Sequence, residues 1–101
     1  MIRITAVCGM GLGSGLLVKM GVERVLKRND FSEREFAVEV ADISTARAIP
    51  TDIYVTTAEF SKQLGQVKAK ILEVHNLFSE KEIEAKLLEP YRETRTAKGL
   101  K

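Results

Sequence analysis

Apolar and polar residues in the first part of the chain follow two different periods. Residues Ile2–Val7 alternate and end at Cys8, which predicts a strand followed at once by glycines. Over residues 16–27 the apolar side chains recur every three to four positions, which predicts an amphipathic helix that ends at Asn29 and Asp30. Phe36–Ala41 is rich in β-forming residues with one charge, so we expect an edge strand there.

The second part of the chain repeats this alternation in shorter segments. We expect a short helix at residues 44–48, stopped by Pro50, and a central parallel strand at the uniformly apolar residues 53–55. Residues 59–64 predict one or two helical turns before Gly65, and residues 67–74 predict a lysine-bearing edge strand. Residues 79–82 form a capping box for a last helix, which Pro90 should end or kink near residue 89.

Strands that alternate with helices predict an α/β fold. We expect a three-layer sandwich around a small four-stranded parallel sheet in the order 2-1-3-4, Rossmann-like or flavodoxin-like. The chain should form one domain over residues 1–101, with an ordered core at about 2–89 and a charged, solvated C-terminal tail at about 92–101. In such folds ligands bind at the carboxyl ends of the strands, which directs attention to Cys8.

Composition narrows the class of protein. The chain is 45% hydrophobic and 30% charged with a net charge of +2, which argues against intrinsic disorder and against nucleic-acid binding. No apolar run exceeds three residues, so we expect neither membrane insertion nor an N-terminal signal peptide. One cysteine and one histidine allow no disulfide and predict no metal site, and a lone thiol fits the cytoplasm. We expect the isolated protein to be a monomer.

Cys8 opens a segment that holds four of the seven glycines. Backbone N–H groups that converge in a glycine-rich segment before a helix can bind an anion, and a cysteine beside them should favour its thiolate form. This pattern predicts a catalytic nucleophile, Cys8, and a phosphoryl cradle. The predicted phosphate-binding residues are Gly9, Met10, Gly11, Leu12, Gly13, Ser14 and Gly15.

Other phosphate-binding motifs fit the segment less well. The dinucleotide fingerprint and the nucleotide P-loop both require glycines where Ser14 or Leu16 stands. The tyrosine-phosphatase signature places an arginine six residues after the cysteine, and Ser14 occupies that position here. A free-standing phosphatase is therefore disfavoured. The remaining alternative is that Cys8 is a small buried hydrophobe and the glycines only form a tight turn.

The same residues resemble the enzyme IIB components of the bacterial sugar phosphotransferase system, most closely the ascorbate-type branch and next the galactitol type. That branch shows Cys-Gly-x-Gly-x-Gly-Ser-Ser after its first strand, and this chain matches the pattern up to Ser14 and departs at Gly15. The pairs and segments at residues 52–53, 74–79 and 86–89 also resemble the family, so the resemblance covers about residues 2–89.

The resemblance implies a cytoplasmic phosphocarrier without a cofactor. Cys8 would accept a phosphoryl group from a phosphohistidine of enzyme IIA and pass it to ascorbate or a related sugar held by the membrane permease, enzyme IIC. That activity is a protein-phosphocysteine–sugar phosphotransferase of EC 2.7.1 type. Its site should be flat and exposed, since both partners must reach it, with no pocket large enough to recognise a sugar.

Several neighbouring residues could assist such a site. His75 could place partial positive charge near the phosphoryl group, although a surface or capping role is the simpler alternative. Thr56 and Thr57 could border the site or serve only as turn residues. Met10 and Leu12 could be exposed contacts for a partner.

Two other functions stay open: a hydrolase similar to the low-molecular-weight tyrosine phosphatases, and a regulatory phosphoprotein without a transport role.

Overall fold

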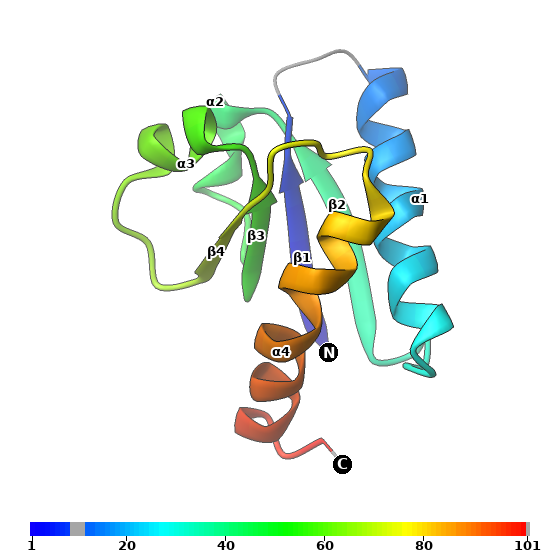
Figure 1. Cartoon of the computed structure of the whole chain (residues 1–101). Helices are drawn as coiled ribbons and strands as arrows, with labels where there is room; N and C mark the ends of the chain where they lie inside the picture. Colours follow the sequence, from blue (N-terminus) through cyan, green and yellow to red (C-terminus); the bar gives the residue numbers. More distant parts are fainter. Residues whose placement is uncertain (9–11, 101) are drawn as a thin grey trace.

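Helices and strands alternate along the chain in the computed structural model (Figure 1). The structure describes residues 1–8 and 12–100, and for residues 12–14 it describes the backbone only. The α/β class predicted from the sequence is confirmed. The elements are β1 (Ile2–Val7), α1 (Leu12–Arg28), β2 (Phe36–Ala41), α2 (Ile43–Ala46), β3 (Ile53–Thr56), α3 (Ala58–Leu64), β4 (Lys70–Glu73) and α4 (Glu80–Ala97).

The four strands form one parallel sheet in the order β2-β1-β3-β4. Ile4 of β1 lies opposite Val38 of β2 on one side and Ile53 of β3 on the other, so β1 is a central strand. The predicted order, with the second and fourth strands at the edges, is confirmed. Because all strands are parallel, their carboxyl ends meet at one edge of the sheet, the upper edge in Figure 1.

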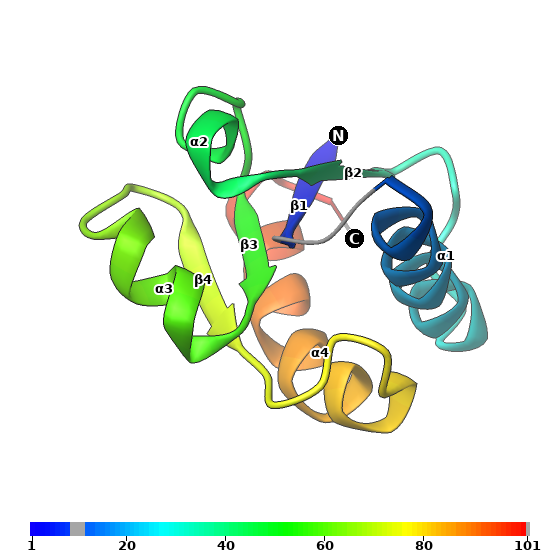
Figure 2. The ribbon, with the colours of Figure 1, turned by 90° about the horizontal axis from the view of Figure 1, so that it is seen from above.

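Helices cover both faces of the sheet, which makes the three layers of a flavodoxin-like sandwich (Figure 2). On one face, the apolar stripes of α1 and α4 pack against β1 and β3 in the main core. These stripes include Val22 of α1 and Leu87 of α4. On the other face, Ala46 of α2 and Leu64 of α3 pack against Tyr54 in a smaller core.

Helix α1 begins four residues earlier than the sequence pattern predicts. Its predicted end is confirmed: the helix stops at Arg28, and Asp30 adopts a left-handed backbone with φ 67°. The start at Leu12 places residues 12–15 in the first helical turn rather than in a connecting loop. The apolar period begins only at Val18, so it could not indicate a glycine-rich first turn.

Of the two outcomes predicted at Pro90, an end or a kink, the end of the last helix near residue 89 is wrong. Helix α4 continues through Pro90 to Ala97, and Tyr91 and Thr94 are buried. Arg95 donates from Nε to Glu35 Oε2 at 2.5 Å, and Lys98 Nζ lies 2.8 Å from Asp52 Oδ2. A proline inside a helix costs about 3 kcal/mol, and the packing of this last part of the helix offsets that cost. The expected solvated tail at 92–101 is therefore largely helix.

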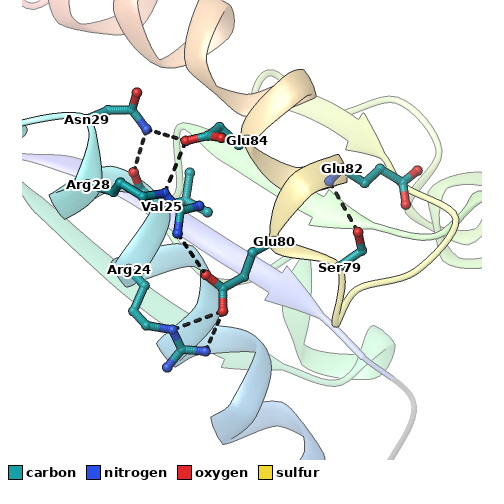
Figure 3. Close-up of polar contacts among 8 residues, drawn as sticks. All are labelled: Arg24, Val25, Arg28, Asn29, Ser79, Glu80, Glu82 and Glu84. Atoms are coloured by element: carbon teal, nitrogen blue, oxygen red, sulfur yellow. Dashed lines mark hydrogen bonds and ion pairs between the residues drawn. The ribbon is translucent and has the colours of Figure 1, made fainter.

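The first turn of α4 is joined to α1 by a polar network (Figure 3). Arg24 donates from Nε and Nη2 to Glu80 Oε2 at 3.0 and 2.7 Å, and Arg28 reaches the other oxygen of Glu80 at 3.4 Å. Asn29 donates from Nδ2 to Glu84 Oε2 at 2.7 Å. These contacts hold the beginning of α4, and the segment before it, at a defined position relative to α1.

Candidate functional site

Cys8 stands at the carboxyl end of the central strand β1. Its N–H donates to the carbonyl of Ala41 at 3.1 Å, which extends the β1–β2 pairing by one residue. Its exposed fraction is 6%, and it packs within the main core. The expectation of an exposed cysteine is therefore wrong, because Cys8 belongs to the same buried cluster as Val74 and Leu77, which follow β4.

A pocket of about 370 Å³ opens beside Cys8. Residues from two further strand ends line it: Thr57, Glu59 and Phe60 where α3 begins, and residues 75–78 between β4 and α4. The volume lies in the range of small-molecule pockets, which begins at about 300 Å³. The expectation of a flat site without a sizeable pocket is wrong as well.

The predicted phosphate-binding residues fall into three groups. Gly9, Met10 and Gly11 lie outside the described residues. Leu12, Gly13 and Ser14 form the first turn of α1, and their side chains lie outside the description. The first N–H groups of a helix have no partner within it, so this turn supplies donors and the positive end of a helix dipole next to Cys8 in the chain. The predicted role of these residues as a phosphoryl cradle remains a prediction.

Gly15 has a packing reason to be glycine. It is buried, and a Cβ atom at this position would lie 2.5 Å from Cγ1 of Val40 on β2. The serine found here in the resembling family would make the same clash. In this chain, the close approach of α1 to β2 therefore favours glycine at this position.

Two helical glycines make this close approach testable. We expect Gly15→Ala to destabilise the protein by about 1–2 kcal/mol, because overpacking against Val40 outweighs the gain in helix propensity. The matched control is Gly21→Ala in the same helix, whose Cβ would meet Glu80 Cγ at an ordinary 3.6 Å. That variant should gain about 0.5–1 kcal/mol. Urea unfolding of both variants measures the difference, and equal effects would contradict the clash.

The two threonines after β3 have different positions. Thr56 is fully buried and donates from Oγ1 to the carbonyl of Val7 at 3.1 Å, so it ties β3 to β1 and has a structural role. Thr57 lines the pocket and is the N-cap residue of α3 by backbone geometry, although its side chain makes no capping hydrogen bond. Thr57 therefore borders the site, and Thr56 supports the strand that carries it.

His75 lines the same pocket as Cys8 and is held by Glu82 of α4. Glu82 Oε2 accepts from the His75 backbone N–H at 2.6 Å and contacts His75 Nδ1 at 2.9 Å, while Oε1 accepts from the Asn76 N–H at 3.0 Å. The bond from the His75 backbone is the main cause that lowers the pKa of Glu82 to about 2, against an opposing effect of burial. Glu82 is therefore ionised at neutral pH.

The capping box is confirmed in part. Ser79 Oγ accepts from the Glu82 N–H at 3.3 Å, as predicted. The Glu82 carboxylate does not close the box on Ser79, whose N–H donates to Asn76; it binds the segment after β4 instead. Figure 3 shows the Glu82 side chain directed away from the Glu80 and Glu84 network.

Sequence reasoning missed Glu59, Phe60, Phe78 and Glu82 as site residues. The first three follow the carboxyl ends of β3 and β4, where parallel sheets place their ligand sites, so applying that rule to every strand would have indicated them. Glu82 was identified as a helix cap only. Its contact with His75 depends on how the preceding segment folds back, which no local pattern specifies.

Comparison with known proteins identifies the family of the chain. Residues 3–89 match the family described as "PTS system, Lactose/Cellobiose specific IIB subunit". The chain is also 32% identical over 89 residues to a protein of Mycoplasma pneumoniae described as "Ascorbate-specific PTS system EIIB component", covering 85% of this chain and 90% of that protein. The chain belongs to the PTS IIB family.

Membership in the IIB family makes this protein a component of a sugar phosphotransferase system with a general phosphotransferase role. It implies interaction with other components of that system, such as IIA and IIC. The two descriptions name different sugars, lactose or cellobiose in one and ascorbate in the other.

Two further features concern only the part of the chain that the structure describes. Within it, no helix combines the length and the apolar character that crossing a bilayer requires. Among residues 1–8 and 12–100, His, Cys, Asp and Glu side chains do not gather in groups of three that could hold a metal ion.

Proposed function

We propose that Cys8 of this IIB protein is the phosphoryl carrier. It accepts a phosphoryl group from a phosphohistidine of enzyme IIA and passes it to ascorbate or a related sugar bound by the membrane enzyme IIC. The protein thus acts in the cytoplasm, as a monomer when isolated, as a protein-phosphocysteine–sugar phosphotransferase of EC 2.7.1 type. The covalent phosphocysteine replaces any cofactor, and the sugar assignment rests on the similarity to the ascorbate-specific component.

The observation that carries the proposal is the position of Cys8. Its thiol belongs to the last residue before the glycine-rich segment, at the carboxyl end of a central parallel strand and beside a pocket. The 17-residue helix α1 begins four positions later and brings a positive dipole end to this edge of the sheet. The positive end of the helix dipole favours a bound phosphoryl group.

The transfer chemistry needs two displacements at phosphorus. In the first, the Cys8 sulfur attacks the phosphorus, the P–N bond breaks, and its electron pair returns to the imidazole of the donor. In the second, a sugar hydroxyl oxygen attacks and the S–P bond breaks. Backbone N–H groups of residues 9–15 would stabilise the three equatorial oxygens in both steps.

The missing arginine and the contacts of Asp42 support a carrier more than a hydrolase. A cysteine phosphatase uses an arginine to stabilise charge and an aspartic acid to protonate the leaving group, and Ser14 replaces that arginine. Asp42, at the carboxyl edge, caps α2 by accepting from Ser44 Oγ at 2.7 Å and from the Thr45 N–H at 3.0 Å. The Ser44 bond is the main cause that lowers the pKa of Asp42, so it is a poor proton donor.

Two incubations distinguish carrier from hydrolase. The purified protein should become labelled by phosphorylated IIA and should show no steady turnover of an aryl phosphate. We expect aryl phosphate turnover to be slower than that of a cysteine phosphatase by at least 10²- to 10³-fold. Losing one oxyanion donor costs about that much, and here a whole charged group, the arginine, is missing. Glu59 is the acidic side chain lining the pocket that a hydrolase would use. Steady turnover that Cys8→Ser abolishes and Glu59→Gln reduces would replace the carrier by a phosphatase.

A further inference from the structure

The hydroxyl of Thr56 contacts the peptide group that leads into Cys8, and the following inference rests on the carrier function proposed above. Thr56 Oγ1 donates to the carbonyl of Val7 at 3.1 Å. That carbonyl and the Cys8 N–H belong to one planar peptide group, and the N–H donates to the carbonyl of Ala41 at 3.1 Å. The peptide group is thus held from β3 at its oxygen and from β2 at its nitrogen, which fixes its orientation.

This contact lies just past the end of the paired part of β1 and β3. The register of the two strands runs up to Ala6 and Val55, so the Thr56 hydroxyl adds a link one residue further along. The carbonyl of Thr56 accepts from the Val74 N–H at 2.8 Å, which connects the end of β4 to the same point. Thr56 therefore joins three strands at the residue before Cys8.

The burial of Thr56 indicates what its hydroxyl is for. Thr56 is fully buried, and a buried hydroxyl destabilises a protein unless it is hydrogen-bonded. Ile53 and Val55 of the same strand are aliphatic and buried, so a valine at position 56 would continue the strand and keep the branched shape. Packing alone does not require a polar group here, whereas holding the Val7 carbonyl does.

Phosphoryl transfer depends on where the Cys8 sulfur lies. The sulfur must approach phosphorus in line with the bond that breaks, and a misplacement of about 1 Å can cost about a hundredfold in rate. A single rotatable bond separates the cysteine backbone from its sulfur, so the orientation of the backbone restricts the positions that the sulfur can reach. The next residue in the chain is Gly9, which has no side chain to hold the backbone from that side.

We propose that Thr56 is a positioning residue for phosphoryl transfer: its hydroxyl fixes the peptide group between Val7 and Cys8 and thereby aligns the Cys8 sulfur for attack on phosphorus. Because Thr56 is fully buried, it touches no partner protein. Loss of its hydroxyl should therefore lower the maximal rate of transfer and leave the KM for phosphorylated IIA unchanged.

The test compares two buried threonines. Thr56→Val removes the donor and should lower the rate of Cys8 phosphorylation at saturating phosphorylated IIA about tenfold, with KM unchanged. Thr56→Ser keeps a hydroxyl and should restore most of that rate. Thr94→Val is the matched control: it removes the α4 hydroxyl that donates to the carbonyl of Pro90 at 2.9 Å, and it should leave the rate unchanged.

Two further measurements separate positioning from stability. Urea unfolding shows that each variant is folded under the assay conditions and compares the stability that the two valine variants lose. Hydrogen exchange of the Cys8 N–H should accelerate in Thr56→Val beyond any change at the Ile4 N–H, in the middle of β1, and should not do so in Thr94→Val. A loss of global stability alone would accelerate both amides through the same unfolding reaction.

The outcomes separate this inference from the function on which it rests. A Thr56→Val rate equal to that of Thr94→Val, or a loss that Thr56→Ser does not restore, overturns the positioning role. If the wild-type protein itself is never phosphorylated at Cys8, the carrier function fails instead, and hydrogen exchange at Cys8 then decides by itself whether Thr56 fixes this peptide group.

Discussion

Replacing Cys8 by alanine is expected to abolish phosphorylation of the protein by phosphorylated IIA. The thiol is the only sulfur nucleophile that the chain offers at this edge of the sheet, and no other side chain can form phosphocysteine. Cys8 is also buried, so the substitution should cost about 1 kcal/mol of stability through lost packing. Transfer of radiolabelled phosphate measures the first effect and urea unfolding the second.

The control for this variant must separate chemistry from stability. Val25→Ala removes a fully buried side chain of α1 in the same core and should cost more stability than Cys8→Ala. It should still accept phosphate as long as it is folded. Labelling of Cys8→Ala at the wild-type level would show that another residue carries the phosphoryl group, and the proposed function would fall.

Replacing Tyr91 by alanine is expected to destabilise the protein by about 3–5 kcal/mol, the range for large aromatic residues removed from a core. Tyr91 is fully buried and its ring packs against Phe31 and Phe36, with centroid distances of 4.6 and 6.4 Å. Its hydroxyl donates to Glu35 Oε2 at 2.9 Å, and Arg95 donates to the same oxygen. Burial, and next the Glu35 carboxylate, raise the pKa of Tyr91, so the hydroxyl stays protonated as a donor.

Tyr91→Phe separates the ring from its hydroxyl. This variant keeps the aromatic packing and loses one hydrogen bond, while Glu35 retains Arg95, so the expected loss is about 1 kcal/mol. Both variants are compared by urea unfolding monitored by circular dichroism. A loss of stability below about 1 kcal/mol for Tyr91→Ala would contradict this packing. The segment after Pro90 would then be the solvated tail that its sequence suggests.

The predicted sheet was confirmed because each strand carries its own local signal. Alternation in β1, a uniformly apolar β3 and charged residues in β2 and β4 indicate which strands are central and which lie at the edges. Burial on both faces demands apolar residues, and an edge tolerates charge, so composition indicates which two strands lie at the edges. The predicted fourth strand, residues 67–74, was longer than the observed Lys70–Glu73. Boundaries depend on pairing, and β4 pairs only where β3 lies beside it.

The sequence by itself determined the α/β fold, the two edge strands and the position of Cys8 at the carboxyl end of β1. It also determined the glycine-rich pattern that follows Cys8. These features depend on spacing along the chain, where strand periods, helix periods and glycines act over a few residues. The proline rule is also local, and it failed at Pro90 because Tyr91 and Glu35 are 56 residues apart in the chain and meet only in the folded protein.

Only the tertiary structure decided that Cys8 is buried and that a pocket lies beside it. It also decided that a Cβ atom at Gly15 would meet Val40 and that Glu82 contacts His75. Each of these depends on the distance between atoms from different elements: Val40 against α1, or a carboxylate of α4 against the segment after β4. Such distances arise when helices and strands pack to fill the core, and the free energy of that packing belongs to pairs of residues that no local pattern connects.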